Sequence, residues 1–279
     1  MIIFEFIKAF ILGVVQGITE WLPISSTGHM IIVDAFMPLK VYSDEIVNKQ
    51  FVDMFFVVIQ FGSILAVLLL YFNKLNPFSS KKSQSQKRDT IMLWVKVVIA
   101  ALPAAVIGLL FDDYIDELLY NPLTVAITLI LYGVIFILIE RNKPQSKIKN
   151  LNDLSFKTAF LIGVFQTLAL IPGTSRSGST ILGAILLGTS RTVASEFSFF
   201  LAIPVMFGAS LLKLIKLKIS LGFIGIAILL VGMITAFLVS VVAIKSLMKY
   251  IRKNDFTIFG YYRIILGLVV IIFSLLKVI

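Results

Sequence analysis

This sequence has no cysteine, a single histidine and little charge. Only 14% of its 279 residues are charged, whereas 59% are hydrophobic. Without cysteine the chain can form neither a disulfide framework nor a thiol nucleophile. A soluble domain of this length would carry more charge on its surface, so the composition indicates a membrane protein. The N-terminal stretch MIIFEFIKAF lacks a basic n-region, and we expect no cleaved signal peptide.

Long apolar runs are abundant. A run of about twenty apolar residues spans a hydrocarbon core of roughly 30 Å. Six segments meet this description, namely 54–72, 91–111, 122–140, 197–212, 221–244 and 258–276. Lys96 and Arg263 lie near the ends of two of them, and we expect both side chains to snorkel to the membrane surface. The sequence therefore predicts an all-α polytopic membrane protein.

The formal net charge of +10 is spread over short connections. Basic residues cluster at 74–88, 141–157 and 245–253, which argues against a nucleic-acid partner. Short connections rich in Lys and Arg stay in the cytoplasm. The acidic stretch 112–119 is then expected to form an outside loop, and both termini are expected outside.

Two further apolar stretches, about 1–40 and 156–193, are interrupted by Pro, Gly, Ser and Thr. The first contains GVVQGITEWLPISSTGH and the second contains GVFQTLALIPGTSRSGS. An offset of 150 aligns several of their residues, although the prolines are one residue out of step: Gly13 with Gly163, Gln16 with Gln166, Ser25 with Ser175, and Gly28 with Gly178. This pattern indicates a duplication. We predict two repeats, 1–150 and 151–279, each with one re-entrant hairpin and three spans.

Three spans per repeat is an odd number, so the two repeats should be inverted relative to each other. In inverted repeats, unwound backbone from both halves meets near the middle of the membrane. Such backbone is tolerated there only where protein buries it or where it lines a water-filled cavity. We therefore expect the two polar hairpins to meet.

The hairpins together carry polar groups that suit phosphoryl transfer. The first hairpin contributes Gln16, Glu20, Ser25, Ser26, Thr27 and His29, and the second contributes Gln166, Ser175, Arg176, Ser177, Gly178 and Thr180. Gln16 and Glu20 share one helix face. A Gly- and Ser-rich turn before a helix offers N–H donors to an anion, and arginine offers a planar fork to phosphate.

Each group taken singly also has an ordinary structural explanation. Glu20 could line a water-filled helix end, His29 could be an interfacial histidine, and Arg176 could be a cytoplasmic anchor. The serines could cap freed carbonyls, and the two glutamines could form hydrogen bonds between helices. Their joint occurrence in two paired hairpins favours a functional site.

The motifs resemble those of the bacterial undecaprenyl-diphosphate phosphatases, also described as the bacitracin-resistance protein family. GVVQGITEWLPISSTGHM and PGTSRSG resemble the two signature motifs, and the similarity covers essentially the whole chain. It implies an enzyme of the bacterial cell membrane that removes the terminal phosphate of undecaprenyl diphosphate. The product is the lipid carrier for peptidoglycan and other envelope polymers. The implied fold is six spanning helices plus two re-entrant hairpins in inverted repeats, with the active site open to the outer face.

The resemblance assigns catalytic roles to Glu20, Ser26, His29 and Arg176. The family has Glu or Gln at the place of Gln16, which weakens an acid–base or metal role for that position. It also implies a divalent cation, magnesium or calcium. No carboxylate cluster forms a metal cage, but an ion bridging Glu20 and the diphosphate suits magnesium.

Three routes of attack are open from the sequence, and the first of them is slightly favoured. His29 attacks directly and gives a phosphohistidine, Ser26 attacks with help from Glu20 or His29, or water attacks. Arg176 and the 175–178 backbone are expected to hold the diphosphate, with the prenyl tail among apolar helices or in lipid.

One rival function is a transporter or flippase of the same lipid, because transporters also use inverted repeats. A less favoured rival is an ion channel. Phosphate release by the purified protein without a gradient would distinguish an enzyme from a carrier. The oligomeric state is open, a homodimer included.

We predict that the basic 74–88 connection faces the cytoplasm. Because the chain has no other thiol, Ser83→Cys should escape an impermeant maleimide in intact cells and react after permeabilisation. Glu117→Cys, in the acidic stretch, should react in intact cells. Labelling of Ser83→Cys in intact cells would reverse the predicted orientation.

Overall fold

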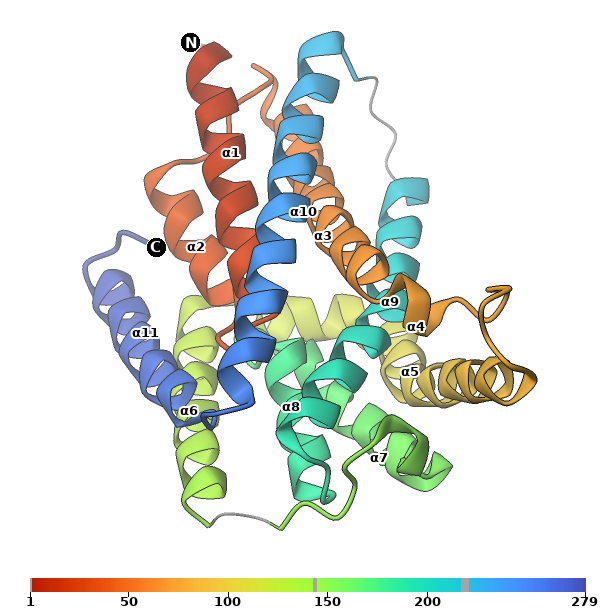
Figure 1. Cartoon of the computed structure of the whole chain (residues 1–279). Coiled ribbons are helices and arrows are strands. Elements are labelled where there is room, and N and C mark those ends of the chain that lie inside the picture. Colours follow the sequence, from red (N-terminus) through yellow and green to blue (C-terminus); the bar gives the residue numbers. More distant parts are fainter. Residues whose placement is uncertain (1, 143–144, 217–220) are drawn as a thin grey trace.

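The computed structural model describes residues 2–142, 145–216 and 221–279; for Asp112, Asp113, Asp116, Ala209 and residues 212–216 it describes the backbone alone. The described chain is helical (Figure 1), apart from one isolated bridge between Ile148 and Thr189. The helices are α1 (Ile2–Thr19), α2 (Ser26–Phe36), α3 (Glu45–Leu70), α4 (Phe72–Leu75), α5 (Gln84–Leu119), α6 (Pro122–Arg141), α7 (Phe156–Thr167), α8 (Arg176–Leu186), α9 (Arg191–Lys216), α10 (Phe223–Ile251) and α11 (Thr257–Leu275). Two 3₁₀ turns, η1 (Leu151–Asp153) and η2 (Leu168–Leu170), complete the set. The predicted all-α class is confirmed.

Six of the described helices are long and apolar enough to cross a membrane, as expected of a polytopic membrane protein. They are α1, α3, α5 as far as Phe111, α6, α10 and α11. Five of these overlap predicted spans. The sixth predicted span, 197–212, lies within α9, whose last turns fall outside the described side chains. Its place among the six is taken by α1, which we had assigned to a hairpin.

The predicted acidic loop at 112–119 is wrong, because this stretch is the end of α5. The helix runs for 36 residues and ends at Leu119. A residue before proline is disfavoured in the α conformation, so the chain turns at Asn121 instead. The Asn121 side chain caps α6 by accepting a hydrogen bond from the Thr124 amide at 2.9 Å.

Both interrupted stretches form pairs of helices joined by irregular backbone. In the first, α1 packs against α2, and in the second, α7 packs against α8. The breaks contain Pro23 and Pro172, which have no backbone N–H to continue a helix. The broken segments run from residue 20 to 25 and from residue 171 to 175.

The two broken segments end in the same unusual geometry. Ser25 and Ser175 have φ values of 70° and 73°, which are uncommon for residues with a Cβ. Such conformations carry a strain on the order of 1–3 kcal/mol and persist where their surroundings hold them. Each serine hydroxyl accepts a hydrogen bond from the amide three residues on, Gly28 at 3.3 Å and Gly178 at 3.2 Å.

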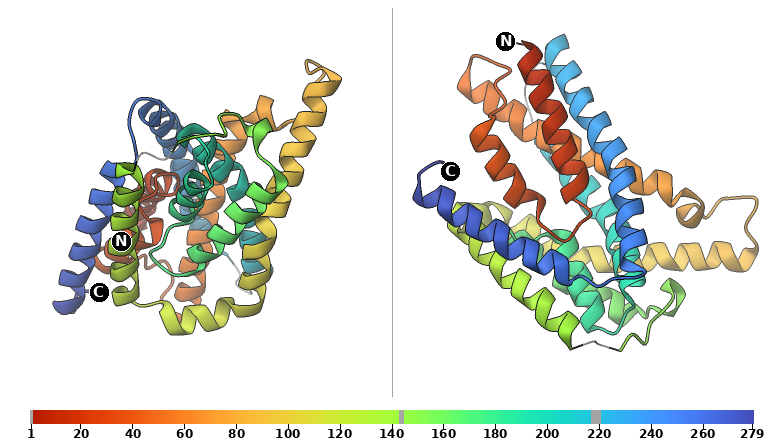
Figure 2. Two further views of the ribbon diagram at one scale, coloured as in Figure 1. Left: turned by 90° about the horizontal axis from the view of Figure 1, so that it is seen from below. Right: turned by 60° about the vertical axis from the view of Figure 1, so that its left-hand side comes forward.

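Small residues bring the long helices close together. α6 and α11 lie side by side in Figures 1 and 2, and a Cβ on Gly133 or on Gly260 would stand 2.7 Å from the carbonyl oxygen of the other. Gly13 lets α1 approach α10 in the same way, and Gly163 lets α7 lie against the Ala100 carbonyl of α5. Close helix contact through glycine is typical of membrane proteins.

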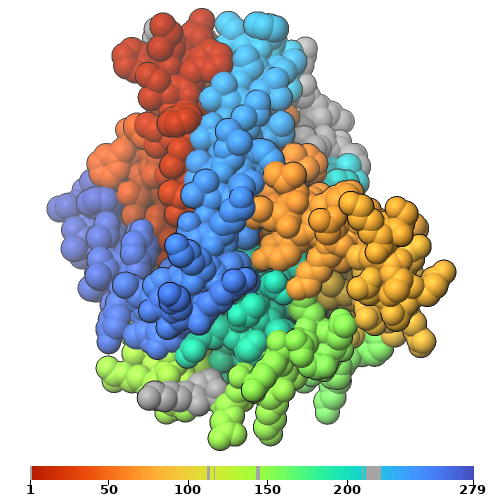
Figure 3. Space-filling model, in the orientation of Figure 1, coloured from red at the N-terminus to blue at the C-terminus, as the bar shows by residue number. Residues whose placement is uncertain are grey.

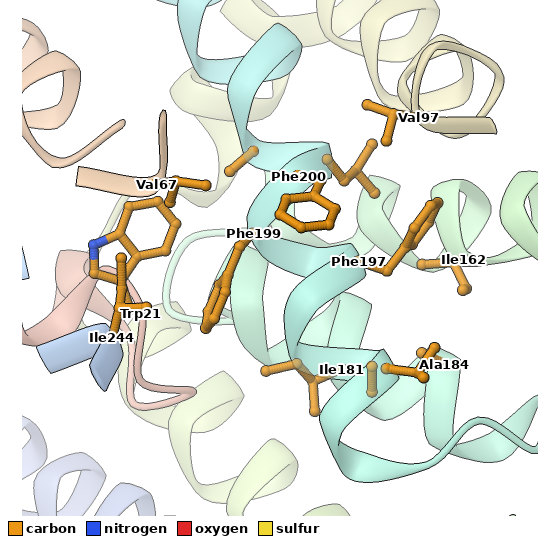
Figure 4. Close-up of a cluster of buried hydrophobic side chains, with 14 of the residues drawn as sticks. Trp21, Val67, Val97, Ile162, Ile181, Ala184, Phe197, Phe199, Phe200 and Ile244 are labelled. Carbon is orange, nitrogen blue, oxygen red and sulfur yellow. The ribbon is translucent and has the colours of Figure 1, made fainter. Parts of the chain in front are cut away.

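The largest group of buried apolar side chains includes Trp21 of the first broken segment. Figure 4 shows Trp21 of this segment beside Val67 of α3 and Ile244 of α10, with Phe199 of α9 nearby. The rings of Trp21 and Phe199 meet edge to face, with centroids 5.4 Å apart. This packing fixes the segment that carries Glu20.

Candidate active site

The two broken segments meet through an ion pair. Arg176 Nη2, at the start of α8, donates to Glu20 Oε1, just after α1, at 2.9 Å. The side chains are only 12% and 7% exposed, so both charges are withdrawn from water. Charges inside a membrane protein are costly unless they find a partner, and each supplies one for the other. The expected meeting of the hairpins is thus present.

Two further predicted residues bind the second oxygen of the same carboxylate. Gln16 Nε2 donates to Glu20 Oε2 at 3.0 Å, and Ser26 Oγ donates to that oxygen at 3.3 Å. Gln16 reaches it because the two residues lie four apart and Glu20 continues the helical hydrogen bonding of α1. The Glu20 carboxylate therefore joins Gln16, Ser26 and Arg176.

Arg176 is held in place from three sides. Its Nη1 donates to the Ser198 carbonyl oxygen at 2.9 Å, and its guanidinium lies 5.4 Å from the centroid of the Trp21 ring. Thr180 shares a 2.6 Å hydrogen bond with the Ser198 hydroxyl. The Nε of Arg176 has no hydrogen-bond partner among the described residues. The side chain is fixed while one donor stays unused.

Ser177 binds the second hairpin to the first. Its hydroxyl lies 3.2 Å from the carbonyl oxygen of Glu20 and 3.1 Å from that of Leu22. These carbonyls have lost their helical partners because the backbone is broken there, and a buried carbonyl needs a donor. Ser175 and Gly178 act within the second hairpin, in the cap of α8.

His29 lies apart from the carboxylate. Its Nδ1 is 2.7 Å from the Ser25 carbonyl oxygen, and its Nε2 is 2.7 Å from the Tyr262 hydroxyl of α11. A carbonyl oxygen only accepts, so Nδ1 carries the proton, and Nε2 of the neutral ring accepts from Tyr262. The two rings are stacked, with an interplanar angle of 9°. Among the described residues His29 makes no hydrogen bond to Glu20, Ser26 or Arg176.

Two other predicted binding residues lie outside the hydrogen-bonded cluster. Gln166 is 1% exposed, and both its amide nitrogen and its amide oxygen are without a partner among the described residues. The repeat explains this, because Gln16 binds Glu20 four residues later whereas the residue four after Gln166 is Leu170. Thr27, half-buried in the first turn of α2, has no side-chain hydrogen bond in the described part of the chain.

Arg263 does not snorkel, contrary to our prediction. Its side chain is fully buried. Its Nη1 donates to the Pro23 carbonyl oxygen at 3.2 Å, and its Nη2 donates to those of Gly173 at 2.9 Å and Thr174 at 3.0 Å. Arg263 therefore joins the tips of both hairpins. A charge within an apolar run was the signal that could have identified it, because such residues are expected to have a specific role.

Lys96 was also predicted to snorkel to the membrane surface, and it does not. It is 8% exposed, and its Nζ donates to the Asn152 carbonyl oxygen of η1 at 3.1 Å. It thus holds a connection against α5 and lies on none of the hairpin tips.

Carboxylates are scarce at the site. Within the described residues, no group of three or more His, Cys, Asp or Glu side chains is placed to hold a metal ion. Glu20 is the carboxylate that the two hairpins bring to their meeting point, and Arg176 already binds one of its oxygens.

Comparison with known proteins gives one consistent result. The family model described as bacitracin resistance protein BacA matches residues 9–269. An undecaprenyl-diphosphatase of Enterococcus faecalis is 60% identical over 269 residues, which are 95% of each chain. The undecaprenyl-diphosphatase of Acetivibrio thermocellus is 60% identical over 97% of this chain and 98% of its own. The undecaprenyl-diphosphatase of Streptococcus mutans is 53% identical over 100% of this chain and 99% of its own.

We predict that Arg263→Met lowers the thermal unfolding midpoint of the purified protein by several degrees. Three buried carbonyl oxygens would lose their donor, and an unsatisfied buried group costs about 1–3 kcal/mol. Lys96→Met, which removes another buried cation but only one such bond, is the control and should have a smaller effect. Equal midpoints for the two variants would contradict a clamping role for Arg263.

Proposed function

The chain belongs to the bacitracin resistance protein BacA family, and we propose from this how its hairpins catalyse the reaction. Its activity is that of an undecaprenyl-diphosphatase, a hydrolase of the bacterial membrane. The reaction removes the terminal phosphate of undecaprenyl diphosphate and regenerates the monophosphate carrier for envelope polymers. The observation that carries the mechanism is the Glu20–Arg176 pair, with the Ser26 hydroxyl bound to the same carboxylate.

Glu20 serves as the resting counter-ion of Arg176. A diphosphate carries more negative charge than a carboxylate, and its oxygens match the planar guanidinium fork. The entering substrate therefore competes with Glu20 for Arg176. The unused Nε of Arg176 supplies one more donor for phosphate oxygen. Arg176 then neutralises charge on the phosphoryl group that is transferred.

Ser26 is the nucleophile in this proposal, and Glu20 is its base. The Ser26 proton already points to Glu20 Oε2, so a path for the proton exists before substrate arrives. Once the diphosphate has taken Arg176, Glu20 Oε1 has lost its ion pair while Oε2 still faces the Ser26 hydroxyl. His29 is less suited to attack, because its Nε2 would first have to release the Tyr262 hydroxyl.

The reaction proceeds in two displacements. Ser26 Oγ bonds to the terminal phosphorus, the anhydride P–O bond breaks, and undecaprenyl phosphate leaves while Glu20 holds the serine proton. Water then attacks the phosphorus of the phosphoserine, and the bond between Ser26 Oγ and phosphorus breaks. The proton held by Glu20 returns to Ser26 Oγ, and inorganic phosphate leaves with both hydrogens of the water. His29, held by Ser25 and Tyr262, fixes the first turn of α2 that positions Ser26.

The residues fit a divalent cation that arrives with the substrate. Magnesium is commonly held by one or two carboxylates together with substrate phosphates, so the single carboxylate of Glu20 is sufficient. We propose Glu20 as the protein ligand of magnesium or calcium. When bound, such an ion would neutralise charge on the diphosphate oxygens.

We also propose that the chain is an inverted duplication of units 1–150 and 151–279. The matching positive φ values of Ser25 and Ser175 support it, as do the matching helix contacts of Gly13 and Gly163. The proposed orientation has both termini outside and the site open to the outer face, from the distribution of basic connections.

The first test of the site is Arg176→Lys. Lysine keeps the charge but lacks the fork, so phosphate release from undecaprenyl diphosphate in detergent should fall by at least ~10²-fold. Arg191→Lys is the control, because Arg191 also pairs with a buried carboxylate, Glu140, but on the α6–α9 contact away from the hairpin tips. Near-normal turnover by Arg176→Lys would refute the bidentate grip. A wild-type protein that releases no phosphate would be a carrier instead.

A second test separates the nucleophiles. Ser26→Ala should lose turnover almost entirely, whereas His29→Ala should lose at most the ~10²–10⁴-fold typical of a proton-transfer or positioning group. Substantial turnover by Ser26→Ala, with an acid-labile phosphoryl group trapped on wild-type protein, would assign the attack to His29.

A further inference from the structure

A second polar feature lies away from the hairpin tips, where the C-terminal ends of α3 and α10 come together. These helices pack against each other, and Figure 3 shows them side by side, α10 in blue and α3 in orange. Between their ends is a pocket of about 250 Å³. Leu70, Ile244 and Met248 form its apolar wall, and Lys245, Lys249 and Arg252 form its charged wall, with Tyr71 between them.

The three cations are exposed and form no ion pair with any of the described residues. Within the described part of the chain, no hydrogen bond or ion pair engages the side chain of Lys245, Lys249 or Arg252. Cations at the end of a helix often bind its last carbonyls, but no such bond is present here. Three like charges around one small pocket repel each other unless an anion lies among them. The pocket is therefore matched to a negatively charged ligand.

A larger neighbouring cavity, of about 440 Å³, is also lined by lysines, but most of these lysines have partners within the protein. Lys74 there forms an ion pair with Glu196 at 2.6 Å. Lys82 donates to the Lys74 carbonyl oxygen at 3.1 Å and to the Thr90 hydroxyl at 2.7 Å. The protein itself supplies acceptors for two of the three lysines of that cavity, Lys74 and Lys82, but for the side chain of Lys81 no partner is present among the described residues. In the smaller pocket none of the three cations has a partner among the described residues.

We propose that the pocket between α3 and α10 binds the phosphate headgroup of an anionic membrane lipid. Both helices are among those long enough to span the membrane, so their ends lie at the membrane surface, where headgroups are found. Lys245, Lys249 and Arg252 bind the phosphate, and the apolar wall contacts the first carbons of the acyl chains. Basic pockets between membrane helices recognise lipid headgroups in this way.

The predicted orientation agrees with this occupant. The 245–253 segment belongs to the basic connections expected in the cytoplasm, and the cytoplasmic leaflet is the one rich in anionic lipid. The apolar wall distinguishes a lipid from free phosphate, which would gain nothing from it.

The test uses native mass spectrometry of the full chain in a neutral detergent, titrated with phosphatidylglycerol or phosphatidylcholine. The wild type should retain one phosphatidylglycerol at least ~10-fold more tightly than phosphatidylcholine, since three cations face its charge. The variant Lys245→Gln/Lys249→Gln/Arg252→Gln should lose this preference. The control Lys87→Gln/Arg88→Gln/Lys157→Gln removes the same charge on the same predicted side of the membrane and should keep it.

Three outcomes would overturn the proposal. The triple variant could retain phosphatidylglycerol as well as the control does, or the wild type could bind both lipids equally. Displacement of phosphatidylglycerol by millimolar inorganic phosphate would identify a site for free anions instead. The comparison of the two lipids on wild-type protein needs no variant, so it decides the matter even where the triple variant does not fold.

Discussion

The membrane interior supplies no water to satisfy backbone groups and charges, so every break in a helix must be satisfied by the protein itself. This constraint explains the centre of the molecule. Breaking α1 from α2 and α7 from α8 frees carbonyl oxygens, to which Arg263 and Ser177 donate. It also leaves amides free at the starts of α2 and α8, from which the capping serines Ser25 and Ser175 accept. The same constraint brings Glu20 and Arg176 together, because among the described residues each forms its ion pair only with the other. The polar tips are thereby joined into one rigid unit.

In the proposed mechanism, the joined hairpin tips also couple the binding of substrate to the activation of Ser26. An ion pair within the protein is satisfied only until a stronger anion arrives, and a diphosphate is such an anion. In the proposed mechanism, its arrival transfers Arg176 from a carboxylate to a phosphate and leaves Glu20 next to the Ser26 hydroxyl. Activation of the proposed nucleophile would then depend on substrate, which would limit reaction with other molecules.

Much of this arrangement could be predicted from the sequence, because its signals are local. Apolar runs predicted five of the six membrane-length helices, and interrupted repeats predicted the hairpins and the meeting of Glu20 with Arg176. The acidic stretch 112–119 was misread because charge suggested a loop, whereas the Asn–Pro pair after it decides where α5 ends. The contacts of Arg263 and Tyr262 were missed because their partners lie more than 80 residues away, and no local pattern encodes such a pairing.

The two hairpins share the cap geometry of Ser25 and Ser175 but differ in their side chains. The offset that aligns Ser25 with Ser175 also aligns Ser26 with Arg176 and Glu20 with Leu170. In the proposed mechanism each half holds only part of the reaction centre: the first has Ser26 and Glu20, and the second has Arg176. Under the proposed duplication, an ancestral half-length protein that paired with itself would have offered two identical centres. Divergence of the halves would then leave neither able to act alone, so that both are needed in a single polypeptide.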